Sequence, residues 1–545
     1  MKRIDDHQTG HLWDPWYFLE GKRRRLLEQS WAGVIRRFLL EELPVEQIAA
    51  AFDARMGRPS KELYTMLGTL VLQQMLDLSD AQVTQGLAFD GRWHYALDIV
   101  GEGDADKYVC ERTVRQYRRI AIEQEVDTVL FESLTDALLK AFGVNVGKQR
   151  LDSTHIVSNM RELRRTELFG EVIEKFLRKL EREQGEPLEQ VPCALRKRYL
   201  KESEGGCFSQ VKPSEAKRTL QPLAEDLLWM AERFKGDEVV SALRSYQLLC
   251  RVLEEQCEVF GQEQEAKRVE VKAPKEVSAN SLQNPSDPDA TYDAHKGPGY
   301  QVQLMETYQA VEDEKEETVP DLITHVEVEP ASRSDMQAVE PAIETTQRRE
   351  CAPQELLADG GYGSDANVQQ AAEENVELMA PVNKGVSAER ERMGLEAFEF
   401  DEQSGTVSRC PARQEPIRTG RTPRGDYTTH FDREKCCGCE LRERSPVKVK
   451  AEGAFLPPYT EKKRRLAQRR AKENTGEFRD KYRWRAGQEG SMARYKAQTG
   501  AGRLRVRGMP SVRFAAKLKA LGLNIFRSAQ ALEAIGQQQR AIIAA

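Results

Sequence analysis

The sequence has no long hydrophobic run. Nothing in its 545 residues approaches 18 uncharged apolar residues in succession, so we expect no membrane-spanning helix. The N-terminal stretch MKRIDDHQTGHLWDPW has no apolar core, so we expect no signal peptide. Ten cysteines in a chain without such a signal predict a protein of the reducing cytoplasm. An internal repeat of solenoid length is also absent from the sequence.

Positive and negative charges are unevenly distributed along the chain, whose formal net charge is −6. Residues 461–527 contain 20 Lys or Arg and 5 Asp or Glu, a net charge of +15. Residues 261–350 contain 9 basic and 20 acidic residues, a net charge of −11. A basic C-terminal third on an acidic protein predicts a polyanionic partner, most often nucleic acid, and the alternative is a solvated helix surface.

Hydrophobic periodicity and composition divide the chain into five regions. The first region is helical. It serves DNA binding or dimerisation, and the alternative is a plain structural scaffold. The second is a discontinuous region rich in strands, interrupted by the third, a charged helical insertion. A cysteine-bearing segment and a basic helical region follow. In order, the regions are 1–140, 141–160 with 271–400, 161–270, 401–455 and 456–545.

The discontinuous region predicts an α/β domain. The stretch VNVGKQRLDSTHIVSNM is rich in strand formers, and GYQVQLMETYQAV and DLITHVEVEP resemble half-buried strands. QELLADGGYGSDANVQQAAEEN predicts a strand, a tight glycine turn and a helix that Ser364 caps, and VELMAPVN predicts a further strand. The order of these elements indicates one α/β domain that the helical region interrupts.

Two acidic residues stand out in this domain, and a third lies in the basic region. Asp152 is on an expected strand in LDSTH, and Asp359 follows an apolar strand in LLADGGY, where two glycines allow close approach of backbone or ligand. Glu489 lies in YRWRAGQEGSMARYK, among many cations. On a continuous helix, Tyr482, Arg485, Glu489 and Lys496 would fall within about 60° of one another around the axis.

Three converging carboxylates favour a metal site. Ligands usually bind at the carboxyl edge of an α/β sheet, and carboxylates that meet there repel one another unless they bind cations. Magnesium suits such a set, because it takes oxygen ligands and binds through few carboxylates plus phosphate. Two such ions, about 3.5–4 Å apart, activate a water and stabilise a leaving oxygen in phosphoryl transfer.

Each acid also has a simpler interpretation. Asp152 could cap a turn, since Asp-Ser-Thr is common turn chemistry. Asp359 could open an ordinary loop. Glu489 could form a surface ion pair with Arg485, four residues before it.

Four residues carry a resemblance to a known family. The Y-x2-R-x3-E-x6-K signature of bacterial insertion-sequence DDE transposases is matched at Tyr482, Arg485, Glu489 and Lys496. Asp152 in DSTHIVSN resembles the first acid motif of that family, and Asp359 in ADGGYGSD resembles the second. GRPSKELYTMLGTLVLQQMLDLSDAQVTQGL is similar to the helical domain that precedes the catalytic core in one branch, and RLRVRGMPSVRFAAKLKALGLNIFR to the C-terminal continuation.

The resemblance implies an RNase H-like core in which Asp152, Asp359 and Glu489 are catalytic and bind two Mg2+ ions, with Mn2+ as a substitute. It implies recognition of terminal inverted repeats in double-stranded DNA, cleavage to a 3′-hydroxyl and transfer of that end to a target, by a homodimer on DNA. The residues implied to contact DNA are Tyr482, Arg485 and Lys496. The alternatives are a transposase-derived DNA-binding protein without catalysis and a metal-dependent nuclease without strand transfer.

Two glycines beside the third acid are unexpected. Gly487 and Gly490 flank Glu489, and each costs a helix about 1 kcal/mol relative to Ala. We expect either a close approach of DNA at these positions or an irregular helix.

The cysteine-bearing segment has zinc-ligand spacing. Cys436-x2-Cys439, with Cys410 in a Cys-Pro turn 26 residues upstream, gives three candidate zinc ligands. Similar transposases often carry a further cysteine shortly afterwards, where this chain has Ser445. Cys437 or His430 could take the fourth place, although Cys437 is poorly placed beside two other ligands. The alternative is a ribbon without metal.

Overall fold

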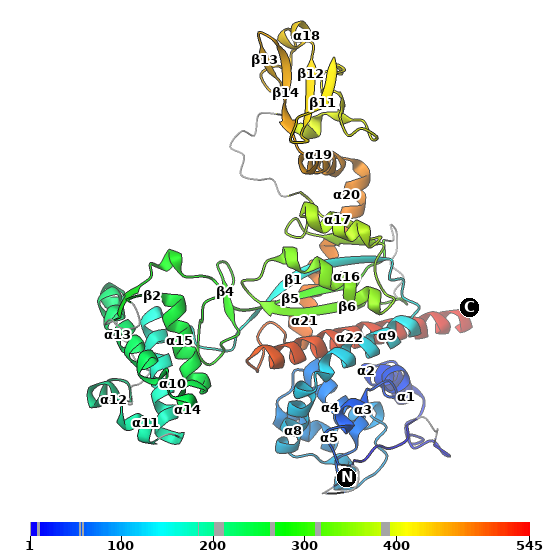
Figure 1. Ribbon diagram of the computed structural model, residues 1–545. Coiled ribbons are helices and arrows are strands. Elements are labelled where there is room, and N and C mark those ends of the chain that lie inside the picture. The colour runs from blue at the N-terminus through cyan, green and yellow to red at the C-terminus, as the bar shows by residue number, and fades with distance from the viewer. Residues whose placement is uncertain are drawn as a thin grey trace.

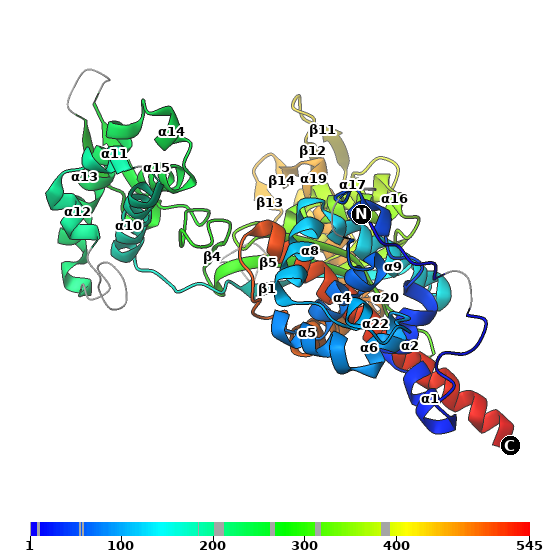
Figure 2. The same cartoon turned by 90° about the horizontal axis from the view of Figure 1, so that it is seen from below.

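The computed structural model describes residues 2–544 except for 8–10, 54–55, 57–58, 184, 201–211, 262–266, 311–317 and 383–392. A central sheet joins three outlying parts, as Figure 1 shows: helices near the N-terminus below it, a helical insertion to one side and a small cysteine-bearing sheet above it. The view from below in Figure 2 separates the insertion from the rest most clearly.

The central sheet has six strands, and five of them lie where the sequence predicts them. The strands β6, β5, β1, β7 and β8 follow one another across the sheet, and β4 also pairs with β5. β1 is antiparallel to β5 and parallel to β7, so the direction of pairing changes at β1. The bounds are β1 Lys148–Val157, β4 Thr291–Asp293, β5 Gly297–Thr307, β6 Ile323–Pro330, β7 Glu355–Ala358 and β8 Glu377–Met379.

Helices cover both faces of this sheet. On one face α16 (Val339–Arg348) and α17 (Asp365–Glu373) pack against apolar residues of β1, β5, β7 and β8. As predicted, Ser364 caps α17, its hydroxyl accepting from the Asn367 N–H. On the other face lie α9 (Val126–Ala141), α21 (Gly487–Thr499) and the long α22 (Met509–Ala544). The mixed α/β character predicted for residues 141–160 and 271–400 is therefore confirmed.

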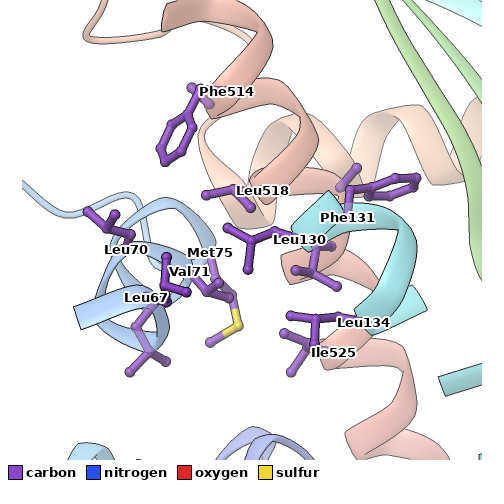
Figure 3. Packing of buried hydrophobic residues seen from close by; sticks show 14 of the residues in the cluster. Leu67, Leu70, Val71, Met75, Leu130, Phe131, Leu134, Phe514, Leu518 and Ile525 are labelled. Carbon is purple, nitrogen blue, oxygen red and sulfur yellow. The ribbon is translucent and has the colours of Figure 1, made fainter. Parts of the chain in front are cut away.

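The N-terminal helices share one hydrophobic core with α22 and the sheet. Figure 3 shows Leu67 and Met75 on α4 facing Leu130 on α9 and Leu518 on α22. A chain cut at residue 141 would expose this interface. The bounds are α1 Gly21–Glu28, α2 Trp31–Val34, a π-helix at Ile35–Leu39, α3 Val45–Ala49, α4 Leu63–Met75, α5 Asp80–Phe89, α6 Gly91–Ala96, α7 Asp104–Lys107 and α8 Glu111–Glu123.

The insertion lies between β1 and β5 and has a hydrophobic core of its own. It is mostly helical, as predicted, but its last part is a β-hairpin, β2 with β3. The prediction of helix up to residue 270 is wrong there, because alternating Val259, Val269 and Val271 favour pairing. The bounds are α10 Arg165–Glu183, α11 Gly185–Glu189, α12 Cys193–Tyr199, α13 Ala216–Phe234, α14 Glu238–Ser241, α15 Arg244–Gln256, β2 Cys257–Phe260 and β3 Arg268–Val271.

The cysteine-bearing segment forms a separate small β-structure between β8 and α19. Its four-stranded sheet has the order β11-β12-β14-β13, and β9 pairs with β10 beside it. The bounds are β9 Glu399–Phe400, β10 Val407–Arg409, β11 Arg418–Arg421, β12 Tyr427–Phe431, α18 Arg433–Cys437, β13 Lys448–Lys450 and β14 Gly453–Tyr459.

The basic region returns the chain from this small sheet to the central one. It consists of α19 (Glu461–Glu473), α20 (Gly476–Tyr482), a 3-10 turn (Arg483–Ala486), α21 and α22. Among the described parts of the chain, no helix combines the length and apolar character needed to cross a membrane.

Candidate active site

Asp152, inside β1, and Asp359, directly after β7, lie side by side where the two parallel strands stop pairing. The last pair in the register is Leu151 with Ala358, and each acid is the next residue along its chain segment. The Asp359 carboxylate accepts from the Gly361 N–H at 2.7 Å. A Cβ at residue 361 would lie 2.9 Å from Asp359 Oδ1, so a larger residue there would displace this carboxylate. The structure thus brings together the first two acids predicted from the sequence.

The environment of Asp152 resists its ionisation. Burial raises the pKa of Asp152 above its usual value, and the nearby Asp359 and Asp335 carboxylates raise it further. The Ser153 N–H, which donates to Asp152 Oδ1 at 2.8 Å, and the charge of Arg485 act in the opposite direction. Asp152 lies inside a strand, so its alternative role as a turn cap does not apply. A buried carboxylate beside two others is a group that a cation would stabilise.

The segment that carries the signature is not one continuous helix. Tyr482 ends α20, Arg485 lies in the 3-10 turn, and Glu489 is in the first turn of α21. The assumption of one continuous α-helix is therefore wrong, because residues in the 3-10 turn advance by about 120° instead of about 100°. Tyr482, at the end of α20, reaches β7, where its hydroxyl donates to the Ala358 carbonyl at 3.2 Å. Burial raises the pKa of Tyr482 to about 12.

Arg485 joins the signature segment to the strand acids. Its Nη2 lies 2.9 Å from Asp152 Oδ2, and its Nη1 lies 3.7 Å from Glu489 Oε1. The Glu489 side chain is 75% exposed. The ion pair proposed as the simpler interpretation of Glu489 is therefore present, but the same guanidinium also reaches Asp152. Two of the three predicted acids share one cation, and the third is the strand neighbour of Asp152.

Packing explains why one of the two positions beside Glu489 is a glycine. A Cβ at residue 487 would lie 2.0 Å from Nη1 of Arg150, whose guanidinium packs against the start of α21. At Gly490 nothing lies within 4 Å of a Cβ, and the structure does not explain it. The irregular geometry expected here is found just before Gly487, in the 3-10 turn.

Lys496 and the other cations of the basic region differ in their surroundings. Lys496 is partly buried, and burial followed by the charge of Lys296 lowers its pKa. At least ten of the 20 Lys and Arg residues in 461–527 form ion pairs within the protein, which reduces the charge that is available to a partner. These ten are Arg464, Arg465, Lys472, Lys481, Arg485, Arg505, Arg513, Lys517, Lys519 and Arg527.

Asp335 is a neighbour of the strand acids that sequence reasoning missed. It begins a short 3-10 turn after β6, and the Gln303 amide donates to its Oδ1 at 3.1 Å. Buried Tyr362, three residues after Asp359, donates to Gln303 Oε1 at 2.5 Å. The only local signal is a turn-forming Ser-Arg-Ser-Asp stretch, because the contact depends on pairing between distant strands.

The cysteine-bearing segment gathers three thiols. Cys410, Cys436 and Cys439 line one pocket together with Ser445, whereas Cys437 is exposed and outside it. Burial, followed by the other two thiols, raises the pKa of Cys436. His430 packs its ring on Phe455 instead, with 4.8 Å between ring centroids. Taken over all the residues described, no three His, Cys, Asp or Glu side chains form a group arranged to hold a metal ion, here or at the acids.

A comparison with protein families identifies the segment that contains Glu489. Residues 409–529 match the transposase DDE domain family. This part of the chain is therefore similar to the DDE domain of transposases. The match spans the transposase signature segment from Tyr482 to Lys496, while Asp152 and Asp359 precede it in the chain. No curated protein matches the sequence.

Proposed function

We propose that this protein is a transposase that cleaves double-stranded DNA at the ends of its element and joins the resulting 3′-hydroxyl ends to target DNA. The observation that carries the proposal is the pair Asp152 and Asp359 on neighbouring parallel strands, bridged through Arg485 to Glu489. The transposase DDE domain match supports DNA as the substrate.

The strand order supports an RNase H-like core. Three antiparallel strands, β6, β5 and β1, are followed by β7 and β8, which run parallel to β1. The first acid lies on the central strand and the second directly after the fourth. The helical insertion between β1 and β5 and the cysteine-bearing sheet after β8 then interrupt the core at two places.

The donor atoms available at the acids fit magnesium. Asp152, Asp359 and Glu489 offer only carboxylate oxygens, and desolvation leaves Asp152 in need of a cation. These three residues would hold two Mg2+ ions, or Mn2+ in their place, which supply an activated water and charge stabilisation for phosphoryl transfer. The guanidinium of Arg485 would then turn from the carboxylates toward a DNA phosphate. Tyr482 and Lys496 would contact the backbone on either side.

Incubation of the purified protein with labelled DNA that carries the terminal inverted repeats tests this function. In Mg2+ we expect a nick at the element end that leaves a 3′-hydroxyl, followed by joined products when target DNA is added, and we expect neither in EDTA. End binding without any nick would favour a transposase-derived DNA-binding protein. Nicking without joined products would favour a metal-dependent nuclease.

The affinity for DNA should fall steeply with salt, because each neutralised phosphate releases counterions. Arg494 is exposed on α21, whereas Arg465 pairs with Asp365 at 2.6 Å. Arg494→Gln is expected to reduce the log–log salt slope by about 0.9, and the control Arg465→Gln to leave it unchanged. A flat slope for the unmodified protein, or equal effects of both substitutions, would rule out this electrostatic surface.

The thiol pocket is one ligand short of a structural zinc site. Cys410, Cys436 and Cys439 would supply three thiolates, and Ser445, which lines the same pocket, would be the position for a fourth ligand. We therefore expect Ser445→Cys to gain the absorption of tetrahedral thiolate-bound Co2+ and a higher zinc affinity. The control Cys437→Ser, outside the pocket, should bind metal like the unmodified protein. One tightly held zinc per unmodified chain would contradict this assignment.

Assembly and DNA recognition complete the proposal. The working form would be a homodimer that holds two element ends in the cytoplasm, and the helices of residues 1–140 would contribute to end binding or assembly. Because these helices share the core of the sheet, deletion is a poor test of their role. The mass of the protein–DNA complex in solution, measured with one and two ends, distinguishes a dimer from a monomer.

A further inference from the structure

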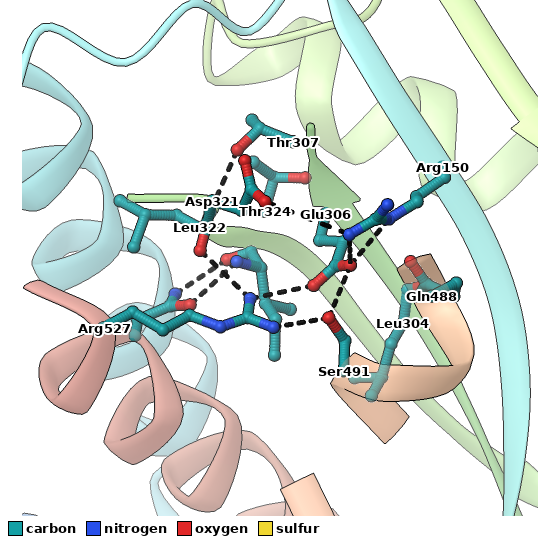
Figure 4. Close-up of polar contacts among 12 residues, drawn as sticks. Arg150, Leu304, Glu306, Thr307, Asp321, Leu322, Thr324, Gln488, Ser491 and Arg527 are labelled. Atoms are coloured by element: carbon teal, nitrogen blue, oxygen red, sulfur yellow. Dashed lines mark hydrogen bonds and ion pairs between the residues drawn. The ribbon is translucent and has the colours of Figure 1, made fainter. Parts of the chain in front are cut away.

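A buried network of charges lies beneath the helix that carries Glu489. Glu306 on β5 is fully buried and accepts from Arg150 Nε at 2.7 Å and from Arg527 Nη1 at 2.8 Å. The hydroxyl of Ser491 on α21 donates to the same carboxylate at 2.7 Å. Figure 4 shows these side chains converging from β1, β5, α21 and α22. One carboxylate therefore connects four elements that are far apart in the sequence.

The same network holds the start of α21 against the sheet. Arg150 Nη1 donates to the Trp484 carbonyl at 2.8 Å, in the 3-10 turn, and its guanidinium packs on Gly487. The amide of Gln488, which is buried, donates to the Leu304 carbonyl at 3.1 Å. The residues on both sides of Glu489 are thus fixed, while Glu489 itself points outward.

The charge state of Glu306 is compatible with this role. Complete burial alone would raise the pKa of Glu306, but the charges of Arg527 and Arg150 and the hydrogen bond from Ser491 hold it below its usual value. A buried ion network of this kind is a weak source of net stability, because desolvation offsets the attraction. It does impose one arrangement on the elements it joins, since any shift leaves a buried charge without its partner.

We propose that Glu306 is a positioning residue that sets the Glu489 helix against the strand of Asp152. The register of the contacts carries the inference: Arg150 is two residues before Asp152, and Ser491 is two residues after Glu489. One carboxylate thus contacts two of the elements that supply acids, the strand of Asp152 and the helix of Glu489. The inference rests on the proposed metal-binding role of Glu489.

The test compares Glu306→Gln with a matched control, Asp127→Asn. Asp127 on α9 is also buried and pairs with two cations, Arg513 at 3.2 Å and Lys517 at 3.7 Å, both on α22. We expect both variants to lower Tm. Only Glu306→Gln should reduce kcat for end cleavage, by about 10- to 100-fold, with a less than twofold change in KM for DNA and a higher Mg2+ requirement. Equal kcat values for the two variants would overturn the proposal.

Hydrogen exchange provides a readout that does not depend on activity. Glu306→Gln should speed exchange of the amides of residues 487–492 and leave α9 protected, and Asp127→Asn should do the opposite. Unchanged protection of α21 in Glu306→Gln would overturn the positioning role. If the unmodified protein does not cleave its ends, the proposed function fails, and the exchange data still decide whether Glu306 positions α21.

Ser491→Ala is the second variant, for the case that Glu306→Gln does not fold. It removes the link to α21 and keeps both arginine contacts of Glu306. We expect a three- to tenfold lower kcat, faster exchange at the start of α21 and a Tm close to that of the unmodified protein. Normal kcat and normal exchange in this variant would contradict the proposal.

Discussion

Asp152→Asn and Asp359→Asn are each expected to reduce cleavage of element ends by about 10³-fold while leaving DNA binding intact. The carboxylates would supply the metal site, and loss of several kcal/mol of transition-state charge stabilisation corresponds to that factor. In the proposed function, affinity would come from cations and helices elsewhere, so it should persist or tighten slightly as negative charge is removed. Cleavage rates at saturating protein, with binding measured in parallel, check this expectation.

An acid outside the site provides the control. Glu477 lies on α20, and its side chain is 78% exposed. Glu477→Gln should cleave at the normal rate. It removes one negative charge, as Asp152→Asn and Asp359→Asn do, but it does so away from the proposed metal site. A rate for Asp152→Asn or Asp359→Asn close to that of this control would remove that residue from the metal site.

Arg485→Gln is expected to lower the cleavage rate by about 10- to 100-fold and to change its pH dependence. Loss of a charge-assisted hydrogen bond, about 1.5–3 kcal/mol, gives the factor. Arg485 lowers the pKa of Asp152, which burial raises, so its removal raises that pKa further. Because ionised Asp152 is needed, activity at subsaturating Mg2+ should begin to fall at a higher pH as the solution is acidified.

Arg485→Lys distinguishes charge from geometry. Lysine keeps the positive charge near Asp152. Its ammonium group lacks the planar, forked donors with which a guanidinium contacts two carboxylates at once. We expect the pH profile of Arg485→Lys to stay near that of the unmodified protein, with a reduced rate. A profile of Arg485→Gln that moves toward lower pH would contradict the assigned electrostatics.

The strand acids could be predicted because their signals are local. Asp152 follows a run of strand formers, and Asp359 lies between an apolar strand and two glycines. In an α/β fold, such positions lie on the side of the sheet where ligands bind. The path of the signature segment could not be predicted in the same way. Its 3-10 turn contacts Arg150, which donates to the Trp484 carbonyl and is far from it in the chain.

Burial of charged residues was the least predictable feature. Glu306 belongs to the alternating stretch GYQVQLMETYQAV, where a polar position would be expected to face solvent. It is buried because its partners arrive from 156 residues before and 221 residues after it. The +15 charge of residues 461–527 likewise overstated the cationic surface, since at least ten of those basic residues pair within the protein.

The third acid is the point on which the account depends most, because Glu489 is exposed and contacts only Arg485 among the charged groups of the site. Glu489→Gln keeps size and helix propensity and changes mainly the charge. The decisive measurement is the rate at which this variant nicks labelled element-end DNA in Mg2+, beside the unmodified protein. We predict normal DNA binding and no detectable nick. Cleavage at the normal rate would show that Glu489 is not the third metal ligand, and Asp480 would be the next residue to replace.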